Sequence, residues 1–338
     1  MMFKILAAIC AALWMGASAQ AQTPADFYRG KTIDLIIGFP TGGSNDAYAR
    51  ALGRHMGKHI PGSPAIVVRN MPGAGSFQAA AHVYSVAPQD GTVLAIGAPT
   101  LSLEQKIGAQ GVRFDTAQFN WIGRINSLIN MIFIKDASPV TSVQDVRTRE
   151  VILAGTGVGS TVSIYPTVMN KLLGYKFKLV MGYKGTNEAM LAVERGEAEG
   201  HNTAWEALKV AHPDWIEQKK VRFLVQFALK RHPDLADTPT VIELTNDPQE
   251  KQILEALVNA TEIGTSFFST PNVPADRVSA LRRAFDATMA DKEFLDELRM
   301  TRLGLSPLTG EQLQTFSQNL GALPDALTQR LKSVYSEN

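Results

Sequence analysis

"GFPTGGSNDAYAR", residues 38–50, directly follows the apolar run "TIDLIIG" of residues 32–38. The pattern predicts a strand that ends at paired glycines and leads into a helix. Such a turn either makes a tight corner or holds an anion, because a helix N-terminus offers unpaired N–H groups and a partial positive charge. Glycines allow close approach of a ligand to the backbone. Ser44 and Asn45 can cap the helix or donate to a ligand oxygen.

The first 21 residues have the pattern of a secretory signal peptide, with one lysine, an apolar stretch and then small residues. Cleavage after Ala19 or Ala21 removes Cys10, the only cysteine, and Ile9 before it argues against a lipoprotein. We therefore expect a mature chain with no disulfide, no thiolate metal site and no lipid anchor, located in a bacterial periplasm.

Composition excludes several classes of protein. Apolar residues make up 45% and charged residues 19% of the chain, with a formal net charge of +1. A near-neutral chain without a basic stripe lacks the electrostatic footprint of a nucleic-acid-binding protein. No later apolar run approaches the ~20 residues of a membrane span. Roughly 317 residues remain after cleavage, enough for about two domains.

Short apolar runs alternate with helix-length segments along the first two thirds of the chain. Examples are "TIDLIIG", "AIVVRN", "TVLAIG", "VILAG", "FKLVMG" and "VRFLVQFAL". This alternation predicts an α/β fold with mostly parallel sheets flanked by helices. The last ninety residues look mainly helical, with Val278, Leu281, Phe285 and Met289 at helical spacing.

Two such series predict two lobes. We expect residues 24–125 and 227–338 to form lobe 1 and residues 126–226 to form lobe 2, with hinge crossings near 123–127 and 226–230. In folds of this type ligands lie beyond the carboxyl ends of the strands, where the glycine loops fall.

Lobe 2 has its own glycine loop at residues 155–161, and "PGAGS" (72–76) and "YKGTN" (183–187) are further loops of the type. One helix terminus contributes ~0.3–1 kcal/mol to binding an anion, up to ~2 when partly buried. Charge-assisted hydrogen bonds add ~1.5–3 kcal/mol each. Two loops together reach the ~8 kcal/mol of a micromolar complex, and one loop does not. The arithmetic fits a small carboxylate held between lobes.

Other site types fit less well. "GTGVGS" spaces its glycines as G-x-G-x-G, and "FKLVMGY" ends without the acidic residue of a dinucleotide site. The P-loop, G-x-S-x-G and H-E-x-x-H patterns are all missing from the sequence.

The histidines suggest few catalytic or metal sites. His55 and His59 lie four apart, a spacing that can bind metal, but we interpret them as a solvated helix face because no third ligand is evident. His201 either faces the cleft or only shapes its loop. If the protein were an enzyme, Asp46 and His201 would be its acid–base pair, although no third residue that would orient them can be named.

Seven motifs in order resemble the Bug-type periplasmic solute receptors of tripartite tricarboxylate transporters, from about residue 24 to the C-terminus. They are "GFPTGGSNDAYAR", "IVVRNMPGAGS", "APQDGTVLAIG", "GTGVGSTVSIYP", "YKGTNEAMLAVERGEAE", "DTPTVIE" and "NVPADRVSALRRAF". The resemblance implies a two-lobed periplasmic binding protein of type II that closes on one small carboxylate, does no covalent chemistry, needs no cofactor, and passes its ligand to membrane components of the transporter. We expect it to be a monomer.

The resemblance also implies ligand contacts. In lobe 1 these are Thr41, Gly42, Gly43, Ser44, Asp46, Ser76, Pro99 and Thr100; in lobe 2 they are Gly159, Ser160, Thr161, Asn202, Thr203 and Trp205. Thr41, Met71 and Ser76 depart from the usual Ala, Arg and Gly. Trp205, if it faces the cleft, favours an aromatic or longer acid. Two alternatives stay open: a receptor that feeds a sensor kinase, and a periplasmic hydrolase or lyase using Asp46 and His201.

Overall fold

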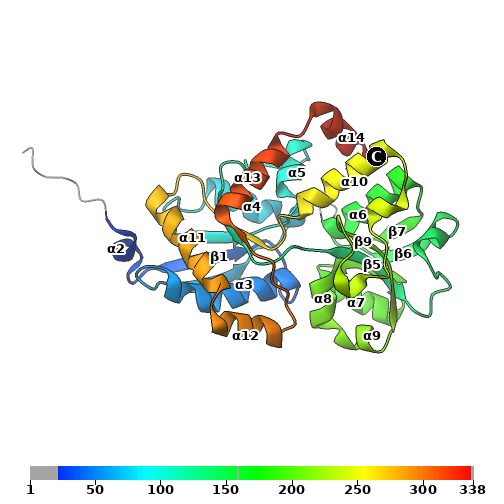
Figure 1. The fold of residues 1–338 in the computed structure, drawn as a ribbon, viewed down its shortest axis with the longest axis horizontal. Coiled ribbons are helices and arrows are strands. Elements are labelled where there is room, and N and C mark those ends of the chain that lie inside the picture. Colours follow the sequence, from blue (N-terminus) through cyan, green and yellow to red (C-terminus); the bar gives the residue numbers. More distant parts are fainter. Residues whose placement is uncertain (1–21, 158–159, 336–338) are drawn as a thin grey trace, which may run out of the picture.

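A computed structural model describes residues 22–157 and 160–335. Its strands form two separate sheets, and the lobes built on them lie side by side along the long axis of the molecule (Figure 1). The predicted α/β fold, with two sheets flanked by helices, is confirmed. The predicted signal peptide, residues 1–21, and the predicted ligand contact Gly159 lie outside the described residues.

Sheet A forms lobe 1 and has the strand order β2-β1-β3-β10-β4-β11. Its strands are β1 (Thr32–Ile37), β2 (Ala65–Asn70), β3 (Val93–Ile96), β4 (Asn120–Arg124), β10 (Ser266–Ser269) and β11 (Leu308–Thr309). Strands β2, β1 and β3 are parallel, whereas β10 is antiparallel to both of its neighbours.

Sheet B forms lobe 2 and has the order β7-β6-β8-β5-β9. Its strands are β5 (Asn130–Lys135), β6 (Val151–Ala154), β7 (Phe177–Val180), β8 (Gly200–Ala204) and β9 (Val221–Phe227). Here β7, β6 and β8 are parallel and β5 is antiparallel to β8 and β9. Each sheet thus receives one antiparallel strand directly after the chain crosses from the other sheet.

Helices cover both faces of each sheet. Around sheet A lie α2 (Pro24–Tyr28), α3 (Ser44–His55), α4 (Phe77–Ser85), α5 (Leu101–Lys106), α11 (Ala275–Met289), α12 (Lys292–Met300) and α13 (Gly310–Gly321). Around sheet B lie α6 (Thr161–Leu173), α7 (Thr186–Arg195), α8 (Trp205–Ala211) and α9 (Pro213–Glu217). Helices α10 (Pro248–Thr261) and α14 (Asp325–Tyr335) contact each other, and α14 packs on α6.

Short 3-10 turns complete the elements: η1 (Met56–His59), η2 (Ala74–Ser76), η3 (Val143–Arg147), η4 (Pro233–Leu235) and η5 (Val241–Leu244). The apolar spacing read along α11 is confirmed, because Val278, Leu281 and Phe285 are buried. In the part of the chain that the structure describes, we find no helix with the length and apolar character needed to cross a bilayer.

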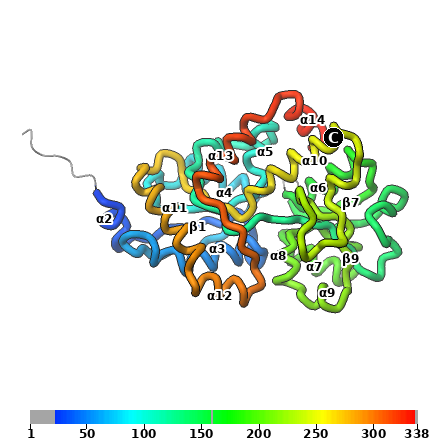
Figure 2. The backbone as a smooth tube through the Cα atoms, in the orientation of Figure 1, coloured from blue at the N-terminus to red at the C-terminus, as the bar shows by residue number. Residues whose placement is uncertain are grey.

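The chain passes between the sheets at 125–129 and again at 228–265, and Figure 2 lets the reader follow both passages. The two passages are hydrogen-bonded to each other. The Ile125 N–H donates to the Thr265 carbonyl at 3.0 Å, and the Thr265 N–H donates to the Asn126 carbonyl at 2.9 Å. The lobe boundaries expected from the sequence stay a prediction, and these two hydrogen bonds mark where the crossings meet.

Candidate functional site

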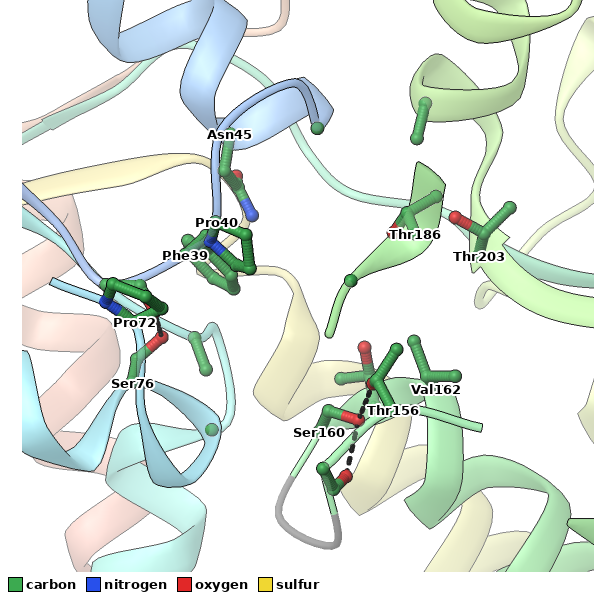
Figure 3. A pocket seen from close by; sticks show the side chains of 18 of the residues that line it. Phe39, Pro40, Asn45, Pro72, Ser76, Thr156, Ser160, Val162, Thr186 and Thr203 are labelled. Atoms are coloured by element: carbon green, nitrogen blue, oxygen red, sulfur yellow. Dashed lines mark hydrogen bonds between the residues drawn. The ribbon is translucent and has the colours of Figure 1, made fainter. Parts of the chain in front are cut away.

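A cavity of about 640 Å³ lies between the lobes and is lined by loops from both (Figure 3). From lobe 1 it is lined by residues after β1 (Gly38–Thr41, Gly43–Asn45), after β2 (Pro72–Ser76) and after β3 (Ala98, Pro99). From lobe 2 it is lined by residues after β6 (Thr156, Gly157, Ser160–Val162) and after β7 (Gly182–Glu188), by Thr203 and Ala204 at the end of β8, and by Ala207 in α8. Leu128 comes from the first passage, and Asn130 begins β5 directly after it. The carboxyl ends of parallel strands therefore face one another across the cavity, as open α/β sheets place their ligands.

Four helices of nine residues or more begin at this cavity: α3, α4, α6 and α7. Their N-cap residues are Gly43, Ser76, Ser160 and Gly185, and in none of the four does the cap side chain accept a hydrogen bond from the helix. The first N–H groups of a helix have no partner within it and carry partial positive charge. The cavity is therefore bordered by four sets of backbone donors, a setting that suits an anion.

Charged side chains play little part in the described lining. Lys184 and Glu188 are its charged residues, and both are exposed. The Glu188 carboxylate accepts the Lys184 N–H at 2.9 Å. Positive potential in the cavity thus comes mainly from the backbone.

The lobe 1 loop is shaped by Asp46, which points away from the cavity lining. Its carboxylate accepts two bonds from Arg50, at 2.9 and 3.0 Å, one from Asn70 at 2.8 Å and one from the Gly42 N–H at 3.0 Å. Burial acts to raise the pKa of Asp46, but these hydrogen bonds outweigh it and hold the pKa below its ordinary value. Asn70 also donates to the Phe39 carbonyl at 2.9 Å. An ionised Asp46 therefore organises residues 39–43 from behind.

Ser76 closes the second lobe 1 loop. Its hydroxyl donates to the Gly38 carbonyl at 2.9 Å, and its φ of 77° lies in the left-handed region. Ala74 and Gly75 before it also have positive φ, 44° and 61°. Ser76 stands where the resemblance led us to expect Gly. Its hydroxyl ties this loop to the end of β1, and the residue still lines the cavity.

Ser160 organises the lobe 2 loop in a similar way. Its hydroxyl donates to the Gly157 carbonyl at 2.7 Å and its N–H donates to the same carbonyl at 3.0 Å. The Thr156 hydroxyl lies 2.8 Å from the Ser160 hydroxyl (Figure 3). Since both Ser160 donors are engaged, the N–H groups of Thr161 and Val162 at the start of α6 are the backbone donors that have no partner among the described residues at this edge.

The lobes touch at the edge of the cavity. A Cβ added to Gly42, whose φ is 89°, would lie 2.5 Å from the Asn187 amide nitrogen. A Cβ added to Gly185 would lie 3.2 Å from Pro40. The loops after β1 and β7 therefore meet across the cleft, and a side chain at Gly42 would have to displace the Asn187 amide and adopt an unfavourable positive φ.

The predicted contacts divide into two groups. Eight line the cavity: Thr41, Gly43, Ser44, Ser76, Pro99, Ser160, Thr161 and Thr203. Gly42, Asp46, Thr100, Asn202 and Trp205 lie outside its lining. Asn202 is buried in β8 and donates to the Thr161 carbonyl at 2.8 Å, so that it supports the lobe 2 loop.

Trp205 packs in the core of lobe 2. Its Nε1 donates to Asp234 at 3.0 Å and its ring meets Phe223 edge-on. The ring is buried because it starts α8 on the face toward that core. The argument for an aromatic acid, which depended on Trp205 facing the cleft, loses its support.

Comparison with known proteins assigns the family. The sequence profile described as "Tripartite tricarboxylate transporter family receptor" matches residues 49–325. The chain belongs to this receptor family. A curated relative from Cupriavidus necator, "UPF0065 protein in gbd 5'region", is 28% identical over 255 residues, which are 71% of this chain and 72% of the relative.

Solved structures share the receptor's fold. The periplasmic binding protein BugD has a TM-score of 0.72 at 21% identity, covering 91% of this chain and 98% of its own. Rpa4515 of R. palustris with adipate has a TM-score of 0.69 at 20% identity, covering 89% and 97%. MatC (Rpa3494) of Rhodopseudomonas palustris with bound malate has a TM-score of 0.67 at 20% identity, covering 91% and 99%.

Sequence reasoning missed several residues that line the receptor's cavity. Asn130, Thr156 and the start of α7 were not among the expected contacts, whereas Asn45 had been named as a possible helix cap or ligand donor. The "YKGTN" loop carried the same glycine signal as the others, and it could have been included on that ground. Asn130 had no such signal, since it lies at the start of a strand that the chain enters from the other lobe.

The two residues considered for a hydrolase or lyase, Asp46 and His201, are both engaged by partners within the protein. His201 is 0% exposed within β8, and its Nδ1 lies 2.8 Å from the Ala154 carbonyl. Burial lowers the pKa of His201 to about 4, against the opposing effect of that hydrogen bond. Asp46 is held by Arg50 and Asn70. Neither His201 nor Asp46 lines the cavity.

The interpretation of His55 and His59 as a solvated face was wrong. His55 Nε2 lies 2.9 Å from Glu297, and His59 Nε2 lies 2.7 Å from Asp291. Helix α12 brings these acids against α3 and η1, and Lys58 also pairs with Asp291 at 2.7 Å. The two histidines therefore make side-chain hydrogen bonds between elements of lobe 1, beside the ion pair of Lys58.

Proposed function

We propose that the receptor captures a small organic carboxylate between its lobes in the periplasm and delivers it to the membrane components of a tripartite transporter. The observation that carries this proposal is the convergence of four helix N-termini, none capped by its own N-cap side chain, on one cavity between the lobes. Each terminus contributes about 0.3–1 kcal/mol to an anion, so no single helix accounts for binding. The four together, with the hydroxyl groups beside them, supply donors for one or two carboxylate groups.

The comparisons support a carboxylate in general terms. Two of the solved structures with the same fold are described with adipate and with bound malate. These two acids differ in length and in hydroxylation. The walls of this cavity combine backbone donors with apolar side chains such as Phe39, Pro72 and Val162. We propose that a carboxylate meets the donors and that the carbon skeleton lies against these walls.

We further propose that the receptor works as a monomer after removal of residues 1–21, and that its lobes close over the ligand by hinge motion. The loops that meet at Gly42 and Asn187 would separate on opening. A ligand that contacts both lobes favours the closed arrangement through its differential affinity for it.

The test is a thermal-shift screen of mono- and dicarboxylates, each paired with its neutral amide. A ligand that binds only the folded state raises the melting temperature, and the increase grows with the ratio of ligand concentration to Kd. We expect at least one acid to raise it and its amide to leave it unchanged, because the amide lacks the charge that four helix termini favour. Calorimetric titration then gives the affinity. A complete panel without a shift would reject the proposal.

The export part of the proposal has a separate test. Expression of the full chain in a Gram-negative host, followed by mass analysis of the periplasmic fraction, should give a chain that starts after Ala19 or Ala21. Retention of the uncleaved chain in the cytoplasm would contradict it.

A further inference from the structure

Asn45 lines the cavity, and it is not the N-cap residue of α3, which is Gly43. It lies in the first turn of that helix. Figure 3 shows its side chain extending into the space between the lobes, with the amide nitrogen at its tip. Its Oδ1 accepts a hydrogen bond from the Thr265 hydroxyl at 3.3 Å. The oxygen end of the amide is therefore occupied within the protein, and the nitrogen end faces the cavity.

Thr265 is well placed to hold this amide. The residue is 0% exposed and directly precedes β10. Its carbonyl accepts from the Ile125 N–H at 3.0 Å and its N–H donates to the Asn126 carbonyl at 2.9 Å. The backbone of Thr265, at the end of the second passage, is thus held by two hydrogen bonds to the first passage, and its hydroxyl reaches Asn45 from this fixed position.

An amide nitrogen donates two hydrogen bonds and accepts none. A hydroxyl, carbonyl or carboxylate oxygen can accept from it, whereas an ammonium group cannot. Glu188 is the acidic side chain in the described lining, but it is exposed and accepts the Lys184 N–H. The site around Asn45 therefore matches an oxygen substituent on the acid better than an amino group.

We propose that Asn45 is a specificity-determining donor, positioned by Thr265, which selects acids with a hydroxyl, keto or second carboxylate oxygen over their amino analogues. The inference rests on the proposed function and adds the substituent that the acid carries. Thr265 does not touch the ligand and acts through Asn45. Loss of its hydroxyl leaves the amide free to turn over and present its oxygen to an ammonium group.

The experiment uses the mature chain and two matched pairs of probes, malate with aspartate and lactate with alanine, titrated by calorimetry. The readout is the ratio of the two affinities within a pair. We expect the unmodified receptor to prefer the hydroxy acid, and Thr265→Val to lower that ratio about five- to tenfold, the value of one neutral hydrogen bond. Thr265→Ser keeps the hydroxyl and should restore the ratio.

Thr270→Val is the matched control. Thr270 follows β10 and is fully buried, and its hydroxyl donates to the Pro88 carbonyl at 3.2 Å, so this variant loses a similar bond that does not involve Asn45. Its ratio should equal that of the unmodified receptor. An unmodified receptor without preference for hydroxy acids in either pair, a ratio unchanged by Thr265→Val, or an equal fall in Thr270→Val would each overturn the inference. The proposed function fails on a different result, namely no shift from any acid in the thermal screen.

Discussion

Replacement of Glu104 by glutamine should stabilise the fold at neutral pH. Glu104 lies on α5 and is 3% exposed, and its Oε1 is buried without a hydrogen-bond partner among the described residues. Burial raises the pKa of this carboxyl from about 4.5 to about 8. The folded chain therefore keeps the proton where the unfolded chain releases it. The stability associated with this group is fully present below about pH 4.5 and is lost as the pH rises through about pH 8.

The size of the effect follows from the same values. Each pH unit in which only the unfolded chain is ionised costs the fold about 1.4 kcal/mol. From the ordinary pKa of 4.5 to about pH 7 the loss reaches about 3 kcal/mol. Glutamine has nearly the shape of the protonated carboxyl and no charge, so the variant should lack this loss. The free energy of unfolding of Glu104→Gln should then exceed that of the wild type by an amount that grows with pH.

The assay is urea unfolding of both proteins without ligand, from about pH 5 to about pH 7.5, followed by fluorescence and by circular dichroism so that a single transition can be verified. Glu255→Gln is the control, since Glu255 is exposed on α10. The difference between Glu104→Gln and the wild type should increase by about 2–3 kcal/mol over this range. A difference that stays constant with pH, or that matches the control, would mean that Glu104 is ionised in the folded protein.

Three further substitutions test the site. Asp46→Asn removes the charge that orders residues 39–43, and we expect about tenfold weaker acid binding by calorimetry together with about 1–3 kcal/mol lower stability; unchanged affinity would show that this loop does not need the ion pair. Ser160→Leu loses the hydroxyl's hydrogen bonds to Gly157 and Thr156 and places a bulky side chain at the cavity, so calorimetry should detect no binding while circular dichroism stays native; retained binding would remove this loop from the site. Trp205→Phe keeps the buried ring and loses the bond to Asp234, so acid affinity should not change; a tenfold loss would place Trp205 within reach of the ligand.

The general position of the site could be predicted from the sequence because it depends on local rules. An apolar run followed by glycines and an amphipathic segment marks the carboxyl end of a strand, and parallel strands bring such ends together. The loops around Gly43 and Ser160 therefore line one cavity as expected. The roles within those loops are less local. Asp46, Ser76 and Ser160 carry polar groups that could meet a ligand, yet each is engaged by a backbone or side-chain partner that only the folded loop provides.

The position of β10 in sheet A could not be predicted in the same way. The four residues of β10 follow a glycine within a region of helical pattern, and nothing in their sequence says that they pair antiparallel with β3 and β4. The same limit applies to Trp205, whose burial depends on the distant partners Phe223 and Asp234. Both features result from contacts between segments far apart in the chain.

The contacts between the lobes differ in kind, and the difference bears on how the proposed closure would work. One apolar cluster runs from lobe 1 into lobe 2 and includes residues of α10 and α14, which lie together over one edge of the molecule (Figure 1). Separating that cluster would expose apolar surface to water at about 25 cal/mol per Å².

Elsewhere the lobes meet through polar groups. Arg302 pairs with Glu217 at 3.0 Å on the surface, and a Cβ on Gly304 would lie 3.3 Å from Glu206 of α8. Burial raises the pKa of Glu206, although Lys209 acts against this, and its Oε2 has no partner among the described residues. Water can replace these contacts at little cost, and it would hydrate the Glu206 carboxylate, which is buried in this structure. The lobes should therefore separate where α8 faces residues 302–304. They should rotate about the edge formed by α10 and α14. The hydrogen bonds between Thr265 and the first passage would then lie near the axis of that rotation.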